Sequence, residues 1–335
     1  MRLVDIVKPA GHPWLPASTG DRRQSSTAAE TPGPPVWGCI RLRTLEFAAL
    51  GPLQVGSNGV RLQLGGRKQR ILLGMLVCSP NEPVTSERLI DALWGAVPPP
   101  SAEKNLRVYI YHLRRILGSE KRITWRAPGY ALTVRPGELD IHLFEDRAAA
   151  GTRALTHDSL AEGADLLHGA LDLWRGPALA GLLDIEHLRA KAVRLEEHRL
   201  DVLEKRIATE LTLRRHTDIV GELRALATEY PLRENLQGQL MVALYRSGRR
   251  AEALEVYRTV RRTLVEELGV EPGAELQQLH QSILLDDALA CHAPPSSGGV
   301  DPDKIVLRQI RESLNLIARL LDRIDPPEPY GSSSP

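Results

Sequence analysis

The chain has 335 residues, of which 42% are hydrophobic and 25% are charged, as in a globular protein long enough for more than one domain. No apolar run approaches the roughly 18–20 residues of a membrane-spanning helix, and the N-terminus lacks the apolar segment of a secretory signal. The three cysteines, Cys39, Cys78 and Cys291, fit neither a disulfide framework nor a metal motif, so a protein of the reducing cytoplasm is expected.

The net charge of +1 conceals opposite charges in two parts of the chain. Residues 67–126 carry 11 Lys and Arg against 5 Asp and Glu, a net of +6. Residues 138–287 carry 19 against 27, a net of −8. This segregation indicates a module that binds an anion, joined to an acidic module.

The N-terminal part divides into a tail and a short β-structure. Residues 1–42 are rich in Pro, Gly, Ser and Thr without periodicity, which predicts a disordered tail. From Thr44 apolar residues alternate with polar or small ones, through Leu45, Phe47, Leu53 and Val55 and, after the turn signal Ser57-Asn58-Gly59, through Val60, Leu62 and Leu64. The alternation predicts a β-meander or hairpin.

Three amphipathic segments then predict three helices. The first covers about Arg67 to Val77, the second begins at the N-cap residue Thr85 and stops at Gly95, and the third runs from the N-cap residue Ser101 to Gly118. They are followed by a second alternating segment, residues 123–134, which turns at residues 127–129.

Two helices joined by a turn and followed by a β-ribbon form a winged helix-turn-helix. We assign this α+β domain to residues 43–136. Three tryptophans, Trp94, Trp125 and Trp174, occupy patterned apolar positions, and each is expected in a core.

Every long segment of residues 138–288 has the pattern of a helix, so the fold class is mainly α. Its helical hairpins with short loops resemble tetratricopeptide units. Residues 289–302 form a linker rich in Pro, Ser and Gly, and residues 326–335 a second disordered tail. Between them, residues 303–325 form a helix with an unbroken a/d seam, which either self-associates or packs back on the helical domain. The seam residues are Leu307, Ile310, Leu314, Ile317, Leu321 and Ile324.

The third helix carries the candidate DNA-recognition residues. At 100° per residue, the stripe that includes Leu106 and Leu113 faces the core. The opposite face holds Lys104, Arg107, Val108, Tyr111 and Arg115, with Asn105, His112 and Arg114 beside it. Glu103 offers Arg107 one ion pair, and the other cations have no partner within the helix. The major groove admits one helix, in which Arg and Lys read guanine, Asn reads adenine and Val contacts thymine methyls.

Two neighbouring groups support DNA binding. Arg67, Lys68 and Gln69 lie at the start of the first helix, where free N–H groups and the helix dipole favour phosphate. Arg126 lies beside the tip of the second hairpin, from which a long cation can enter a minor groove.

Several blocks of the sequence resemble the Streptomyces antibiotic regulatory protein family. LGGRKQRILLGMLV, VTSERLIDALWG, NLRVYIYHLRRILG and RAPGYALTV resemble its DNA-binding domain. LDLWRGPAL, YPLRENLQGQLMVALYRSGRRAEALEVYR and LVEELGVEPGAEL resemble its bacterial transcriptional activation domain. The resemblance implies an OmpR-like winged helix bound to direct repeats upstream of antibiotic biosynthetic promoters, and recruitment of the RNA polymerase holoenzyme. The family often has Asn-Thr in place of Lys104-Asn105 and Arg in place of His112. The operator sequence of a relative therefore cannot be assigned to this chain.

The sequence thus predicts a sequence-specific transcriptional activator of the cytoplasm and nucleoid. It contains no phosphate-binding loop, HExxH or GxSxG motif, and we expect neither an enzyme nor a cofactor. The expected partners are promoter DNA, RNA polymerase and, at least on DNA, a second copy of the chain, without a membrane. The alternatives are a tetratricopeptide-like adaptor, whose basic region binds a protein, and a repressor with the same DNA-binding domain.

Overall fold

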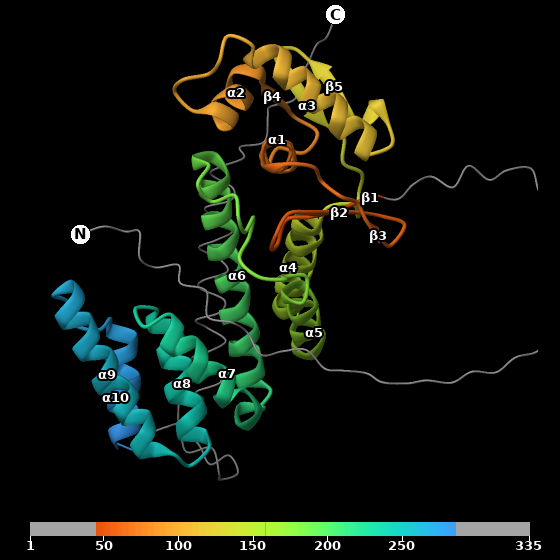
Figure 1. Cartoon of the computed structure of the whole chain (residues 1–335). Coiled ribbons are helices and arrows are strands. Elements are labelled where there is room, and N and C mark those ends of the chain that lie inside the picture. The colour runs from red at the N-terminus through yellow and green to blue at the C-terminus, as the bar shows by residue number, and fades with distance from the viewer. Residues whose placement is uncertain (1–44, 158, 286–335) are drawn as a thin grey trace, which may run out of the picture. The chain divides into compact units, whose positions relative to one another are not determined.

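A computed structural model describes residues 45–157 and 159–285 (Figure 1). The predicted N-terminal tail (residues 1–42), the linker (289–302), the heptad helix with its six seam residues (303–325) and the last tail (326–335) lie outside the described residues.

The described chain begins with a three-stranded antiparallel sheet in the order β1-β2-β3. Phe47 pairs with Val55 in this sheet, and both side chains are almost fully buried, which confirms the predicted alternation. The third strand is shorter than predicted. The strands are β1 (Leu45–Ala48), β2 (Gln54–Ser57) and β3 (Val60–Arg61).

Three helices and a second antiparallel sheet form the predicted winged helix (Figure 1). The sheet has the order β4-β6-β5. Thr85 caps the second helix, because its hydroxyl accepts a hydrogen bond from the Arg88 N–H at 3.2 Å. The sequence did not predict β4, because three residues that begin with a proline show no alternation. The elements are α1 (Arg67–Val77), β4 (Pro83–Thr85), α2 (Ser86–Trp94), α3 (Ala102–Ile116), the 3-10 turn η1 (Glu120–Arg122), β5 (Ile123–Arg126) and β6 (Gly129–Leu132).

The remainder of the described chain is all-helical, as predicted. Glycines with a left-handed backbone follow two of the helices, Gly248 with φ of 74° and Gly269 with φ of 70°, and there the chain reverses. The helices are α4 (Asp140–Thr156), α5 (Leu160–Leu171), α6 (Glu186–Thr212), α7 (His216–Glu229), α8 (Glu234–Arg246), α9 (Arg250–Leu268) and α10 (Ala274–Leu285).

The buried apolar residues form two clusters that meet within α6. The first core extends from Leu45 to Val202 and joins both sheets and α1–α3 to α4, α5 and the first part of α6. The second core extends from Leu200 to Ile283 and is built from the end of α6 and α7–α10. The winged helix therefore shares its core with the helices that follow it.

A buried carboxylate at the start of α4 fixes this helix to the first sheet. The Asp140 side chain accepts hydrogen bonds from the Ala49 and Leu50 N–H groups at 2.8 and 2.9 Å and from Arg175 Nη2 at 3.3 Å. Burial raises the pKa of Asp140, and its three donors offset part of that effect. The contact holds the first sheet, α4 and the segment before α6 in one arrangement.

Candidate nucleic-acid interface

The exposed face of α3 contains the residues that the helical pattern predicts. Lys104, Arg107, Val108, Tyr111 and Arg115 are all exposed. The opposite stripe of α3, with Leu106, Ile110 and Leu113, is buried in the first core, as is Leu117 directly after the helix. Burial of this stripe orients the exposed face away from the domain.

The exposed side chains of α3 have few competing partners among the described residues. Arg107 lies 3.5 Å from the Glu103 carboxylate, the predicted i,i+4 pair, in which both side chains are about three-quarters exposed. Such an exposed pair contributes little and can open for a stronger anion. The Arg115 guanidinium lies 6.0 Å from the centroid of the Tyr111 ring. The face therefore presents cations and two apolar side chains to solvent.

The three flanking residues differ from one another. Arg114 is half-buried, and its Nε donates to the Ile123 carbonyl at 2.8 Å, so this arginine fixes α3 to β5. This partner lies outside the helix, and the sequence did not predict it. The Asn105 side chain donates to the Ser101 hydroxyl at 3.1 Å. Ser101 occupies the N-cap position, as expected, but its side chain accepts no capping hydrogen bond from the backbone of α3. His112 is half-buried, with its ring 5.8 Å from that of Tyr111.

A shallow hollow of about 370 Å³ lies beside α3. It brings Gln69, at the start of α1, together with His112 and Arg115 of α3. The remaining lining residues are Gln63, Gly65 and Ile116. Sequence analysis named Gln69, His112 and Arg115 separately and did not predict that they share a hollow. Amide, imidazole and guanidinium groups around one concave surface suit a phosphate oxygen.

The other two residues at the start of α1 contact protein groups. Arg67 forms an exposed ion pair with Asp184, in the segment before α6, and this pair raises the pKa of Arg67 and lowers that of Asp184. The Lys68 ammonium lies 4.4 Å from the centroid of the Trp94 ring, a cation–π contact. Trp94 was expected in a core, and it is half-buried and packs against the first core.

The wing differs from the prediction in one residue. Arg126 is exposed near the tip, and its Nη1 donates to the Asn81 carbonyl at 3.2 Å. Trp125 was expected in the core, but its exposed fraction is 56%, and that prediction is wrong. Ile123, two residues earlier on the same face of β5, is buried where Arg114 fixes α3 to the strand. The sequence pattern does not show that burial of this face of β5 ends before Trp125. Trp174, by contrast, is buried as predicted.

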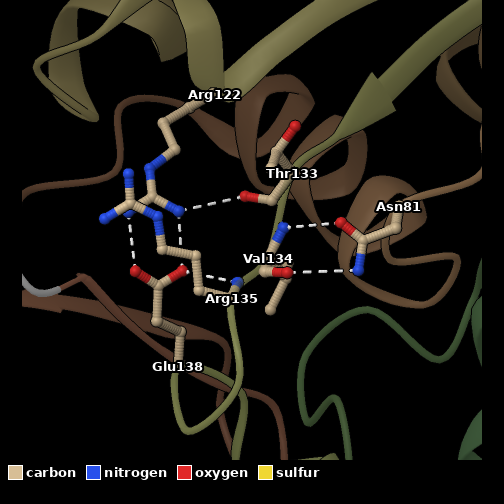
Figure 2. Close-up of polar contacts among 6 residues, drawn as sticks. All are labelled: Asn81, Arg122, Thr133, Val134, Arg135 and Glu138. Atoms are coloured by element: carbon tan, nitrogen blue, oxygen red, sulfur yellow. Dashed lines mark hydrogen bonds and ion pairs between the residues drawn. The ribbon is translucent and has the colours of Figure 1, made fainter.

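A buried ion pair fixes the base of the wing (Figure 2). The Arg122 guanidinium donates two hydrogen bonds of 2.6 Å to the Glu138 carboxylate, and both side chains are less than a tenth exposed. Burial by itself would raise the pKa of Glu138, but the hydrogen bonds and charges of Arg122 and Arg135 outweigh burial and lower it. The sequence did not predict this pair.

An asparagine clamp lies beside the ion pair. The Asn81 side-chain amide donates to the Val134 carbonyl at 3.1 Å and accepts from the Val134 N–H at 3.0 Å (Figure 2). The backbone carbonyl of Asn81 also accepts the hydrogen bond from Arg126 Nη1. It therefore links the α1–β4 connection to both ends of the wing.

The described residues contain no helix that is both long and apolar enough to cross a membrane. Within the same ranges, no three His, Cys, Asp or Glu side chains gather in a way that could hold a metal ion. The prominent feature is the cationic face of α3, with the hollow on one side and the wing on the other.

Fold and surface together define a winged-helix regulator that binds DNA. Residues 61–132 match the family described as "Transcriptional regulatory protein, C terminal", and residues 139–284 match "Bacterial transcriptional activator domain". The chain is 39% identical to regulatory protein DnrI of Streptomyces peucetius over 253 residues, which are 72% of this chain and 93% of DnrI. It belongs to the Streptomyces antibiotic regulatory protein family of transcriptional activators, which confirms the resemblance found in the sequence.

Two further relatives are a longer regulatory protein and a protein of known structure. The chain is 43% identical to regulatory protein AfsR of Streptomyces coelicolor over 73% of its length, but it spans only 25% of AfsR. A solved structure of Mycobacterium tuberculosis EmbR, in complex with a low affinity phosphopeptide, superposes with a TM-score of 0.75 at 32% identity. The superposition covers 82% of this chain and 71% of EmbR.

Proposed function

We propose that the protein activates transcription by placing α3 in the major groove of promoter DNA and bringing RNA polymerase to that promoter. The observation that carries the proposal is the exposed face of α3, on which Lys104, Arg107 and Arg115 surround Val108 and Tyr111. One helix fits the major groove, and side chains of these types contact bases and phosphates there.

The side chains of α3 have distinct proposed roles. Lys104 and Arg107 read guanine edges, Asn105 reads adenine, and Val108 contacts a thymine methyl. Tyr111 and Arg115 contact the backbone. Arg114 positions α3 against the wing through its Nε hydrogen bond.

The flanks of α3 supply contacts that do not depend on sequence. The hollow shared by Gln69, His112 and Arg115 takes a backbone phosphate, with Lys68 as a neighbouring cation. Arg67 contributes once the phosphate replaces Asp184 as its partner. Arg126 reaches the minor groove from the wing. Such contacts fix register, whereas the base contacts of α3 supply specificity.

The proposed operator and partners rest on the resemblance of the sequence to this family. We infer that copies of the protein bind direct repeats upstream of antibiotic biosynthetic promoters, in the cytoplasm on the nucleoid. The acidic helical domain then contacts the polymerase holoenzyme. The relative that this chain nearly spans, DnrI, is named a regulatory protein, which is consistent with regulation and does not identify the genes.

Selection of bound duplexes from a random-sequence pool tests DNA binding and does not require a known operator. We expect one enriched motif, and an affinity that falls with salt by a log–log slope of about −0.9 for each phosphate contact. A failure to enrich any duplex, or binding that salt leaves unchanged, contradicts the proposal and favours an adaptor.

Transcription in vitro tests activation separately. With the selected motif placed upstream of a weak promoter, the protein should increase transcript yield with purified RNA polymerase. A decrease in yield would identify a repressor that uses the same DNA-binding domain.

A further inference from the structure

We propose that Trp125 of the wing packs against the sugar–phosphate backbone of the duplex next to α3. The inference rests on the proposed function, because it adds a contact to the same DNA-binding surface. It assigns a role to a residue that the sequence pattern placed in the core.

The exposure of Trp125 is the first observation. Its exposed fraction is 56%, whereas Trp174 is 9% exposed and Trp94 packs against the first core. A large aromatic side chain on a domain surface leaves apolar area in water, and such area marks a contact surface where it adjoins other binding groups.

The orientation of Trp125 is fixed. Its ring meets the Tyr130 ring edge to face, with centroids 5.1 Å apart and planes at 79°. Trp125 and Tyr130 are paired residues of β5 and β6, and Tyr130 is buried in the first core. The indole is therefore held in place before any partner binds, so it loses little side-chain entropy on binding.

The position of Trp125 makes it continuous with the DNA-binding surface. The Ile123 carbonyl accepts the hydrogen bond from Arg114 of α3, and Trp125 lies two residues farther along the same strand, about 7 Å away. Arg126 follows directly. At the tip of the hairpin, the Pro128 carbonyl accepts from the Ser86 N–H at the start of α2. One end of the hairpin is thus attached to α3, which carries the binding surface, and the tip is attached to α2.

The chemistry around Trp125 favours a polyanion over a protein partner. Lys121 and Arg126 lie close to Trp125 in sequence, Arg114 is hydrogen-bonded to the same strand, and Glu120 is the acidic residue of residues 119–126. The Arg126 guanidinium donates to the Asn81 carbonyl in an exposed hydrogen bond, and the indole is the large exposed apolar group of this part of the wing. An indole offers an apolar face for the deoxyribose and an N–H donor for a phosphate oxygen.

Intrinsic fluorescence of the full chain, titrated with a selected duplex that holds a single site, tests this contact. The emission of the wild type should change on binding, and Trp125→Phe should bind while it loses most of that change. Trp125→Ala should raise the Kd for selected and random duplexes alike by about five- to tenfold, as expected for the loss of one buried indole face. Val60→Ala, at an exposed apolar residue of the first sheet, is the matched control and should leave both Kd values unchanged.

The outcomes separate this inference from the proposed function. If the wild type binds and Trp125→Phe shows the same emission change, Trp125 does not contact DNA and the inference fails, while the proposed function stands. A change that requires a duplex with two sites would assign Trp125 to contact between copies of the chain, which also overturns the inference. If the wild type binds no duplex, the proposed function itself fails.

Discussion

The two cores of the molecule are stabilised in different ways. In the first core, polar anchors are buried. Arg122 pairs with Glu138 at less than a tenth exposure, and Asp140 accepts hydrogen bonds from backbone N–H groups of the β1–β2 connection. In the second core, Arg224–Glu252 and Arg261–Glu271 are both about half exposed. The buried Arg206 there pairs with Glu222, whose side chain is itself 44% exposed. The first core depends on contacts between distant parts of the chain, and the second is a series of neighbouring helices. The orientation of α3 therefore depends on the first core.

The largest effect is expected from Arg122→Met, which leaves the Glu138 carboxylate buried without its partner. Removal of one member of a buried ion pair destabilises by about 3–5 kcal/mol, and denaturant unfolding measures it. DNA affinity should fall as well, because the base of the wing loosens. The double variant Arg122→Met with Glu138→Leu should recover most of the stability, and the absence of recovery would contradict this account.

The same pair predicts a pH dependence with a definite sign. The folded-state pKa of Glu138 lies below its ordinary value of 4.5, so the pair contributes stability that is present above pH 4.5 and lost as pH falls through the folded pKa. In Arg122→Met the buried carboxyl binds a proton more readily. The difference in stability between wild type and variant should therefore shrink as the solution is acidified.

The next effect compares the two cores directly through one fully buried leucine in each. Leu113→Ala in α3 and Leu223→Ala in α7 should each destabilise by about 2–5 kcal/mol through the cavity that they leave. Hydrogen exchange should increase through α1 and α3 in the first variant and through α7–α10 in the second. DNA affinity should fall for Leu113→Ala alone. An equal loss of affinity for Leu223→Ala would show that the two cores act as one unit.

The sequence predicts the parts of this structure that depend on local periodicity. The stripe of α3 and its exposed face follow from positions 3.6 residues apart, and Leu106 and Leu113 are buried as expected. The exposure of Trp125 depends on where α3 ceases to cover β5, and the Arg122–Glu138 pair on how the chain returns after the wing. The hollow of Gln69, His112 and Arg115 depends on α1 and α3 lying side by side. No local sequence pattern indicates the exposed tryptophan, the buried ion pair or the hollow.

A smaller effect on DNA binding is expected from substitution of an exposed arginine of α3, compared with an exposed arginine of α9. Arg107→Ala on α3 should weaken binding of the selected duplex by about 1–3 kcal/mol and relax the base preference at one position. Lys68→Ala should weaken selected and random duplexes alike. Arg258, exposed on α9 and paired with Glu255, is the matched control, and Arg258→Ala should leave DNA binding unchanged. Equal losses on selected and random DNA would make Arg107 a phosphate contact.

The smallest effect concerns a surface carboxylate near the second core. Hydrogen bonds from Arg249 and Arg224 lower the pKa of Glu252 from 4.5 to about 2. Any stability that this contributes is present above pH 4.5 and lost as pH falls toward 2, and solvent screening keeps it small. A carboxyl titration followed by NMR should place Glu252 near pH 2, and added salt should move its midpoint upward. Arg249→Ala should also raise this midpoint, without the loss of stability that Arg122→Met causes. A Glu252 midpoint near its ordinary value would show that the surface ion pairs of the second region do not hold in solution, whereas the buried pair of the first region is tested independently by unfolding.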